Sequence, residues 1–208
     1  MTARTAVLPA TLVLVAAAWI VAVHQMSGMN MGVATDLGSP AFFVAVWVSM
    51  MAAMMLPGAA PALMESARTG GGARAVLFAG LYLAVWSVVG LVVYAVYQPH
   101  GTATAGALTI AAGVYELTPL KRECRRRCRA TVRSGAEFGV YCVGSSIGLM
   151  VMLVALGVMS ITWMVLIALL VLAQKLLPSK AAIDVPLAVA IIALGVAIVV
   201  APSAIPLT

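Results

Sequence analysis

The chain has 208 residues, of which 64% are hydrophobic and only 9% are charged, and its formal net charge is +6. A soluble domain of this size needs far more polar surface, so the composition excludes an ordinary water-soluble protein. The positive charge lies in short segments beside apolar runs, where the preference of Lys and Arg for cytoplasmic loops explains it. It therefore does not indicate nucleic-acid binding.

Seven apolar runs are candidates for membrane-spanning helices, since a spanning helix needs about 20 mostly apolar residues. They cover residues 6–24, 41–63, 75–97, 103–118, 138–157, 160–177 and 183–201. The fourth run is short and rich in small residues, so six spans are an alternative. We predict an all-α, polytopic transmembrane helix bundle that forms a single integral membrane domain over residues 1–208.

The distribution of Lys and Arg predicts the orientation of the spans. With the N-terminus in the cytoplasm, seven spans place all 12 Lys and Arg residues on the cytoplasmic side. Half of them lie within Lys121–Arg129, and we expect this basic segment to contact anionic lipid. We therefore predict a multi-pass protein of the bacterial inner membrane with a cytoplasmic N-terminus.

A methionine cluster follows the first run, on the predicted outer side. Its members are Met26, Met29 and Met31, and His24 lies just before them. Thioether sulfur is soft and neutral, so clustered Met with a nearby His suits Cu(I) better than harder ions. The alternative is an amphipathic interfacial loop in a chain that is rich in Met throughout.

The second run contains a further group of methionines, Met50, Met51, Met54 and Met55. Helical spacing places Met50 above Met54 and Met51 above Met55. The four side chains would form a broad stripe of thioethers within the membrane. Such a stripe could pass a soft cation along, although Met also serves as adaptable packing. Met150, at a comparable depth, and Met159, on the outer side, are further candidate ligands.

The three cysteines lie on the predicted cytoplasmic side, where an odd number argues against a disulfide framework. Cys124 and Cys128 share one face of a helix, close enough to hold one soft metal ion. Neighbouring arginines favour their thiolate forms, which also suit redox chemistry. Cys142 could complete a three-sulfur site or be a buried, inert thiol. Cys124 and Cys128 could also be incidental to a basic loop.

Glu116 lies at the end of the fourth run, where an ionisable group is costly unless it is paired. Lys121 follows one helical turn later and is its predicted ion-pair partner.

Several of these motifs resemble a bacterial family of integral membrane proteins that contain a domain of unknown function and are catalogued as predicted metal-binding proteins. The similar segments lie within residues 45–178 and include Trp47–Pro57, Gly113–Lys121, Cys124, Cys128 and Gly139–Gly144. The family usually has paired Cys at Ser145 and Ser146, Gln at Glu116 and Glu at Gln174. The resemblance implies metal binding, and its departures imply a shift towards Met ligation or a scaffold role.

The leading interpretation is a membrane protein that binds or moves Cu(I). The outer Met cluster would capture the ion, the membrane methionines would pass it on, and the cysteines would accept it, or the direction would be reversed. The alternatives are an accessory subunit of a larger membrane complex, such as a copper-dependent enzyme, and a membrane thiol-redox protein. The sequence contains no nucleotide-binding loop, catalytic triad or haem-attachment motif, so pumping driven by ATP within this chain is not expected.

Overall fold

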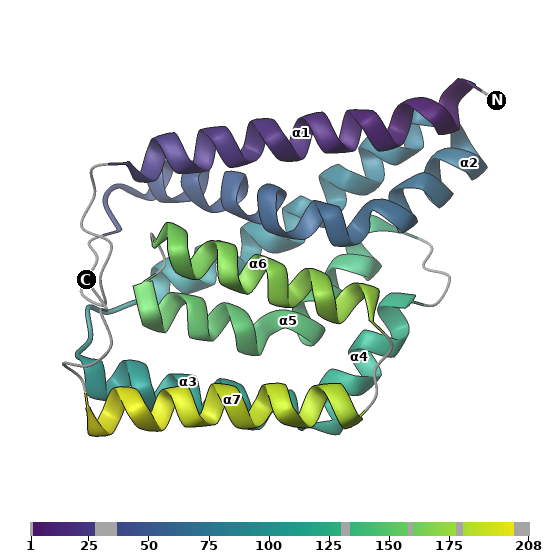
Figure 1. Cartoon of the computed structure of the whole chain (residues 1–208). Coiled ribbons are helices and arrows are strands. Elements are labelled where there is room, and N and C mark those ends of the chain that lie inside the picture. Colours follow the sequence, from purple (N-terminus) through teal and green to yellow (C-terminus); the bar gives the residue numbers. More distant parts are fainter. Residues whose placement is uncertain (1, 28–36, 130–133, 158–159, 178–180, 202–208) are drawn as a thin grey trace. The chain divides into compact units, whose positions relative to one another are not determined.

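The computed structural model describes residues 2–27, 37–129, 134–157, 160–177 and 181–201, and this part of the chain is built from α-helices (Figure 1). They are α1 (Thr2–Met26), α2 (Pro40–Val96), α3 (Thr102–Glu116), α4 (Pro119–Arg129), α5 (Gly135–Gly157), α6 (Ile161–Leu176) and α7 (Ala181–Val200). The predicted all-α class is thus confirmed. Three of the helices, α1, α2 and α5, are long and apolar enough to cross a membrane, and the number of seven spans stays a prediction.

Helix α2 contains two of the predicted spans, because its two arms are separated by a break at Gly70 and Gly71. Gly71 has φ of +74°, which residues with a Cβ rarely adopt, and Gly70 is also outside helical geometry. Ser66 Oγ, before the break, donates a hydrogen bond of 3.2 Å to the Arg74 carbonyl oxygen after it. The break allows the second arm to return along the first.

Helices α1 and α2 belong, with the segment Arg127–Cys142, to one of two compact units. In this unit 1, α1 runs along α2 (Figure 1). Trp47 Nε1, on the first arm of α2, donates a hydrogen bond of 2.8 Å to the carbonyl oxygen of Trp86 on the second arm. Phe138, from the start of α5, packs with its ring centroid 5.4 Å from that of Tyr82. Aromatic side chains therefore join the first arm of α2 to the second, and the second arm to α5.

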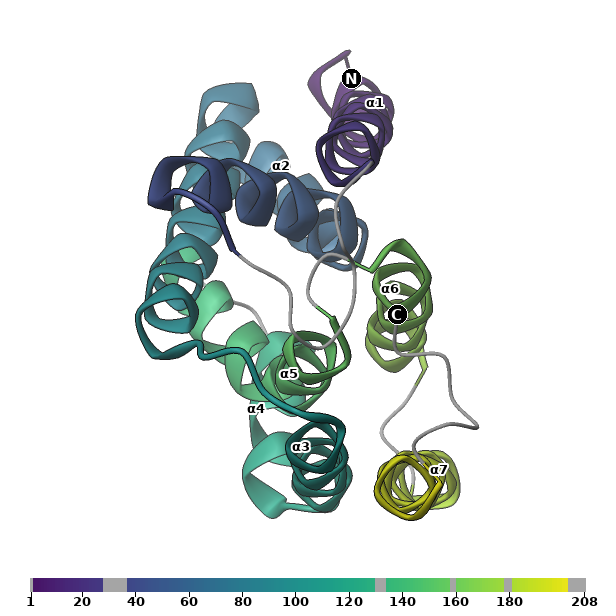
Figure 2. The same ribbon diagram turned by 90° about the vertical axis from the view of Figure 1, so that its left-hand side faces the viewer.

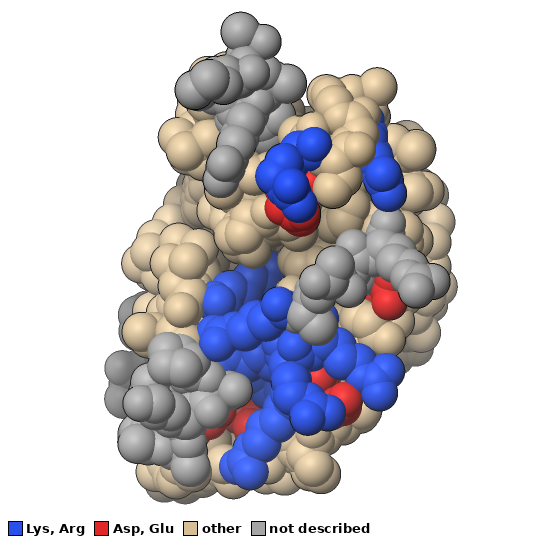
Figure 3. Space-filling view, turned by 90° about the vertical axis from the view of Figure 1, so that its right-hand side faces the viewer, with Lys and Arg blue, Asp and Glu red and all other residues tan. Residues whose placement is uncertain are grey.

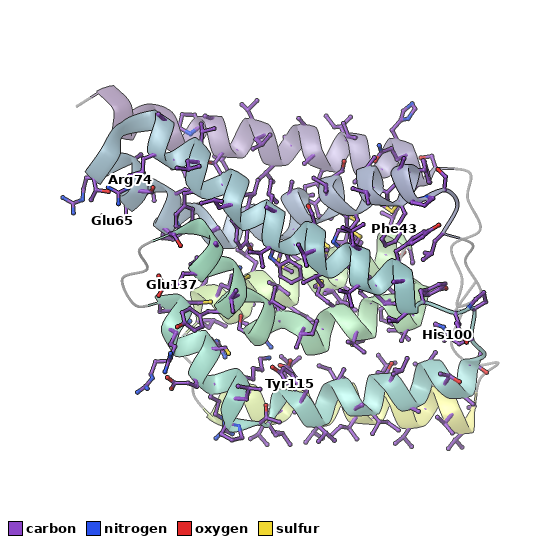
Figure 4. All side chains as sticks on the ribbon, turned by 180° about the vertical axis from the view of Figure 1, so that it is seen from behind. Phe43, Glu65, Arg74, His100, Tyr115 and Glu137 are labelled. Atoms are coloured by element: carbon purple, nitrogen blue, oxygen red, sulfur yellow. The ribbon has the colours of Figure 1, made fainter. Side chains whose placement is uncertain are left out.

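The two ends of unit 1 carry different side chains. Glu65 and Arg74, on either side of the break in α2, lie at one end with Glu137, whereas Phe43 lies at the other (Figure 4). Between the ends, α1 exposes large apolar side chains, among them Val13 at 69% and Ile20 at 70% of their surface. Extended exposed apolar surface is typical of contact with lipid.

Unit 2 contains α3, α4 up to Arg126, α5 from Val143, α6 and α7. Within it, α3 and α7 lie side by side (Figure 2), and glycines let their backbones approach closely. A Cβ at Gly195 would lie 2.8 Å from the Gly106 oxygen, and one at Gly113 would lie 3.1 Å from the Ala188 oxygen. The small residues of the fourth run thus serve a specific helix contact.

Candidate functional site

The four methionines of the first arm of α2 are almost completely buried, with exposed fractions of 0–1% for Met50, Met51, Met54 and Met55. Successive residues of a helix point about 100° apart, so these side chains form two adjacent columns of thioethers. Ala53 and Leu56, on other faces of the same turn, are also buried, at 1% and 0%. This part of α2 is therefore surrounded by protein, and its sulfur atoms do not face lipid.

A thiol lies in the same unit. Cys142 Sγ is 3.1 Å from the hydroxyl oxygen of Tyr82, and both side chains are 0% exposed. Met55 precedes Gly70 by 15 residues and Tyr82 follows it by 12, which corresponds to about 22 Å and about 18 Å of helix from the break. Because the arms return along one another, the Met stripe and Cys142 lie at similar levels of unit 1. No sequence pattern identified Tyr82 as the partner of this thiol.

The predicted outer cluster is described only in part. Met26 is 0% exposed, whereas the side chain of His24 is exposed. Residues two apart on a helix point in nearly opposite directions, so α1 does not turn these two side chains to the same side. Met29 and Met31 lie outside the described residues, and so does Met159.

Cys124 and Cys128 lie on α4 at the predicted spacing of four residues, and both are partly exposed. In unit 2, Cys124 packs against α5, since a Cβ at Gly144 would lie 2.5 Å from its sulfur atom. Across the described ranges, no three His, Cys, Asp or Glu side chains come together as a metal site. The site formed by all three cysteines stays a prediction.

The residues after Gly144 are polar and buried. Ser145 and Ser146 are 6% and 2% exposed, and their hydroxyl oxygens are 3.4 Å apart. One turn further along α5, Met150 is 2% exposed. The two positions at which the resembling family has cysteines thus follow directly after the backbone that contacts the Cys124 sulfur.

A buried ring of polar side chains joins α3, α4 and α6 in unit 2. Lys121 Nζ forms an ion pair with Glu116 Oε2 and donates a hydrogen bond of 3.0 Å to Gln174 Oε1. Gln174 Nε2 in turn donates a hydrogen bond of 2.6 Å to Glu116 Oε2. Burial lowers the pKa of Lys121, although the Glu116 carboxylate favours its charged form. The predicted pair is therefore part of a three-membered network.

Arg125, one turn after Lys121, connects α4 to the ends of α6 and α7. Its Nε and Nη2 donate to the carbonyl oxygens of Gln174 and Leu177, at 2.7 and 2.9 Å, and its Nη1 lies 2.6 Å from Asp184 Oδ1. Carbonyls at a helix C-terminus lack donors within the helix and attract cations. Sequence reasoning missed Asp184 and Gln174, although a polar residue in an apolar run is a signal that it has a partner.

The comparison with known protein families gives one result that covers most of these groups. The model of the PpoB2 family, described as a copper chaperone, matches residues 44–198, which is more than half of the chain. No curated protein and no solved structure shows significant similarity. The matched range includes the α2 methionines, the three cysteines and the buried polar network.

Proposed function

Because the chain belongs to the PpoB2 copper chaperone family, we propose that it binds Cu(I) within the membrane through the thioethers of Met50, Met51, Met54 and Met55. The observation that carries this proposal is the burial of all four side chains on a helix that is long enough to cross a membrane. Neutral sulfur ligands hold a soft monovalent ion without having to lose a proton, which suits an apolar environment.

A cation held only by thioethers would keep its full charge in a medium that solvates charge poorly. Cys142 lies at a similar level of unit 1 and can supply one negative charge as a thiolate. The hydroxyl of Tyr82, 3.1 Å from its sulfur, can donate a hydrogen bond to that thiolate. We propose that Cys142 neutralises the bound ion and that Tyr82 orients its sulfur.

The proposed route runs from the outer end of α1, by way of the α2 methionines, to the cytoplasmic side of the membrane. Met26, with Met29 and Met31, receives or releases the ion outside. Cys128 and Cys124 receive or release the ion on the cytoplasmic side. Met150 and Met159 are proposed as additional ligands. This route assumes seven spans of the bacterial inner membrane with a cytoplasmic N-terminus. A chaperone must also have a partner, and we propose a copper-dependent membrane enzyme.

The stripe is tested by replacing its four methionines with Leu, which is similar in volume and lacks sulfur (M50L/M51L/M54L/M55L). Cu(I) affinity is measured by anaerobic competition with a chromogenic Cu(I) chelator. Changing a residue that only supports the ligands lowers metal affinity by roughly 10–100-fold. Removing the ligands themselves should lower it further. The thermal midpoint should change little, because Leu and Met exchange well in cores.

Met64, which is half-buried on the same arm of α2, provides the matched control. Met64→Leu should bind Cu(I) as the wild type does. Equal copper binding by the fourfold variant and the wild type would refute the proposed site.

A further inference from the structure

The cationic side chains of α4 divide between two faces of the helix. Lys121 and Arg125 point inward and are paired with Glu116 and Asp184, so their charges are balanced within unit 2. Four others are exposed: Arg122, Arg126, Arg127 and Arg129. The external charge of α4 therefore comes from four of its six cationic residues.

Arg127 donates a hydrogen bond of 3.1 Å to the hydroxyl oxygen of Tyr141. The other three, Arg122, Arg126 and Arg129, are called here the arginine row, and they recur at intervals of four and three positions. This spacing aligns them on one face of α4 over a length of about 10 Å. Glu123 contacts Arg126 at 2.7 Å, but this pair is exposed and weak. The row keeps its positive charge. Figure 3 shows Lys and Arg side chains gathered on the face that it draws.

The arginine row lies close in the chain to a helix that can cross a membrane. Only residues 130–134 separate α4 from α5, which is 23 residues long and apolar. At the other end of α4, Leu120 exposes 60% of its surface although it is strongly hydrophobic. A short helix with exposed arginines and an exposed Leu beside a spanning segment is suited to the headgroup region of a bilayer.

We propose that the arginine row binds the phosphate groups of anionic phospholipids at the cytoplasmic surface. A guanidinium group matches a phosphate with two parallel hydrogen bonds and is more weakly hydrated than an ammonium group. The exposed Leu120 favours lipid over an acidic protein, because it can enter the region below the headgroups. The bound lipids hold α4, and with it the thiols of Cys124 and Cys128, at the membrane surface.

The test compares R122Q/R126Q/R129Q with the wild type, each purified and exchanged into phosphatidylglycerol or phosphatidylcholine. Native mass spectrometry then counts the lipids that each protein retains. Each exposed Arg contributes about 1 kcal/mol near an anionic surface, so the variant should bind phosphatidylglycerol on the order of 100-fold more weakly. Retention of the zwitterionic phosphatidylcholine should not change.

The control variant R68Q/R74Q removes two exposed arginines beside the break in α2. It should retain phosphatidylglycerol as the wild type does. Equal loss in both variants would indicate a diffuse effect of net charge and overturn the proposal. Unchanged retention of phosphatidylglycerol in R122Q/R126Q/R129Q would also overturn the proposal. So would an acidic protein that displaces phosphatidylglycerol from the wild type but not from this variant.

Discussion

Replacing Arg125 with Met should destabilise the folded protein by about 3–5 kcal/mol, which is the usual cost of removing one partner from a buried ion pair. The substitution leaves the Asp184 carboxylate buried without its cation. It also removes the donors to the carbonyl oxygens of Gln174 and Leu177. Thermal unfolding in detergent, followed by circular dichroism, measures the loss.

Two further variants separate this pairing from a general effect of charge. Arg126→Met removes an exposed cation from the same helix and should change the stability by no more than about 0.5 kcal/mol. R125M/D184L removes both charges and should be more stable than R125M, because a buried pair can be exchanged for apolar residues. Equal stability of R125M and R126M would contradict the linking role of Arg125.

The second large effect is expected at Glu116. Glu116→Gln leaves Lys121 among amides without a carboxylate, and we expect a loss of about 3 kcal/mol at neutral pH. Adding Gln174→Glu returns a carboxylate to the position now 3.0 Å from Lys121 Nζ, so E116Q/Q174E should recover most of this loss. The direct contact of Gln174 Nε2 with Glu116 Oε2 places the two side chains close enough to exchange roles.

The loss in E116Q should also depend on pH. Burial lowers the pKa of Lys121 from 10.5, and removing Glu116 removes the main opposing influence. Between the lowered pKa of folded Lys121 and its ordinary value of 10.5, the unfolded chain binds more protons than the folded one, so stability rises with pH over this interval. The unfolding curve of E116Q should lie closer to that of the wild type at alkaline pH than at neutral pH.

For the exchange of the two side chains, a double variant E116Q/Q174E no more stable than E116Q would contradict the proposal.

The sequence predicted the local features of the fold well. Apolar run length located the helices, and positions four apart placed the thioethers of α2 on shared faces. The predicted runs 41–63 and 75–97 implied two separate helices, whereas the structure shows one long helix interrupted at Gly70 and Gly71. The position of a helix and the residues that share its face depend on neighbours in the sequence, which is why periodicity and composition can predict them.

Contacts between distant segments could not be predicted in the same way. Lys121 was expected to pair with Glu116, five positions earlier, but its contact with Gln174 depends on how α3, α4 and α6 pack. The same holds for Cys142, whose partner Tyr82 lies 60 residues earlier in the chain. A single sequence contains the polar residues of an apolar run but not the packing that pairs them.

The most direct test of the proposed copper site is X-ray absorption at the copper edge on purified protein loaded with an equimolar amount of Cu(I). A ligand shell made of sulfur in the wild type, and altered in M50L/M51L/M54L/M55L, is the predicted result. A shell of nitrogen and oxygen, or a sulfur shell identical in both proteins, would show that copper is held elsewhere.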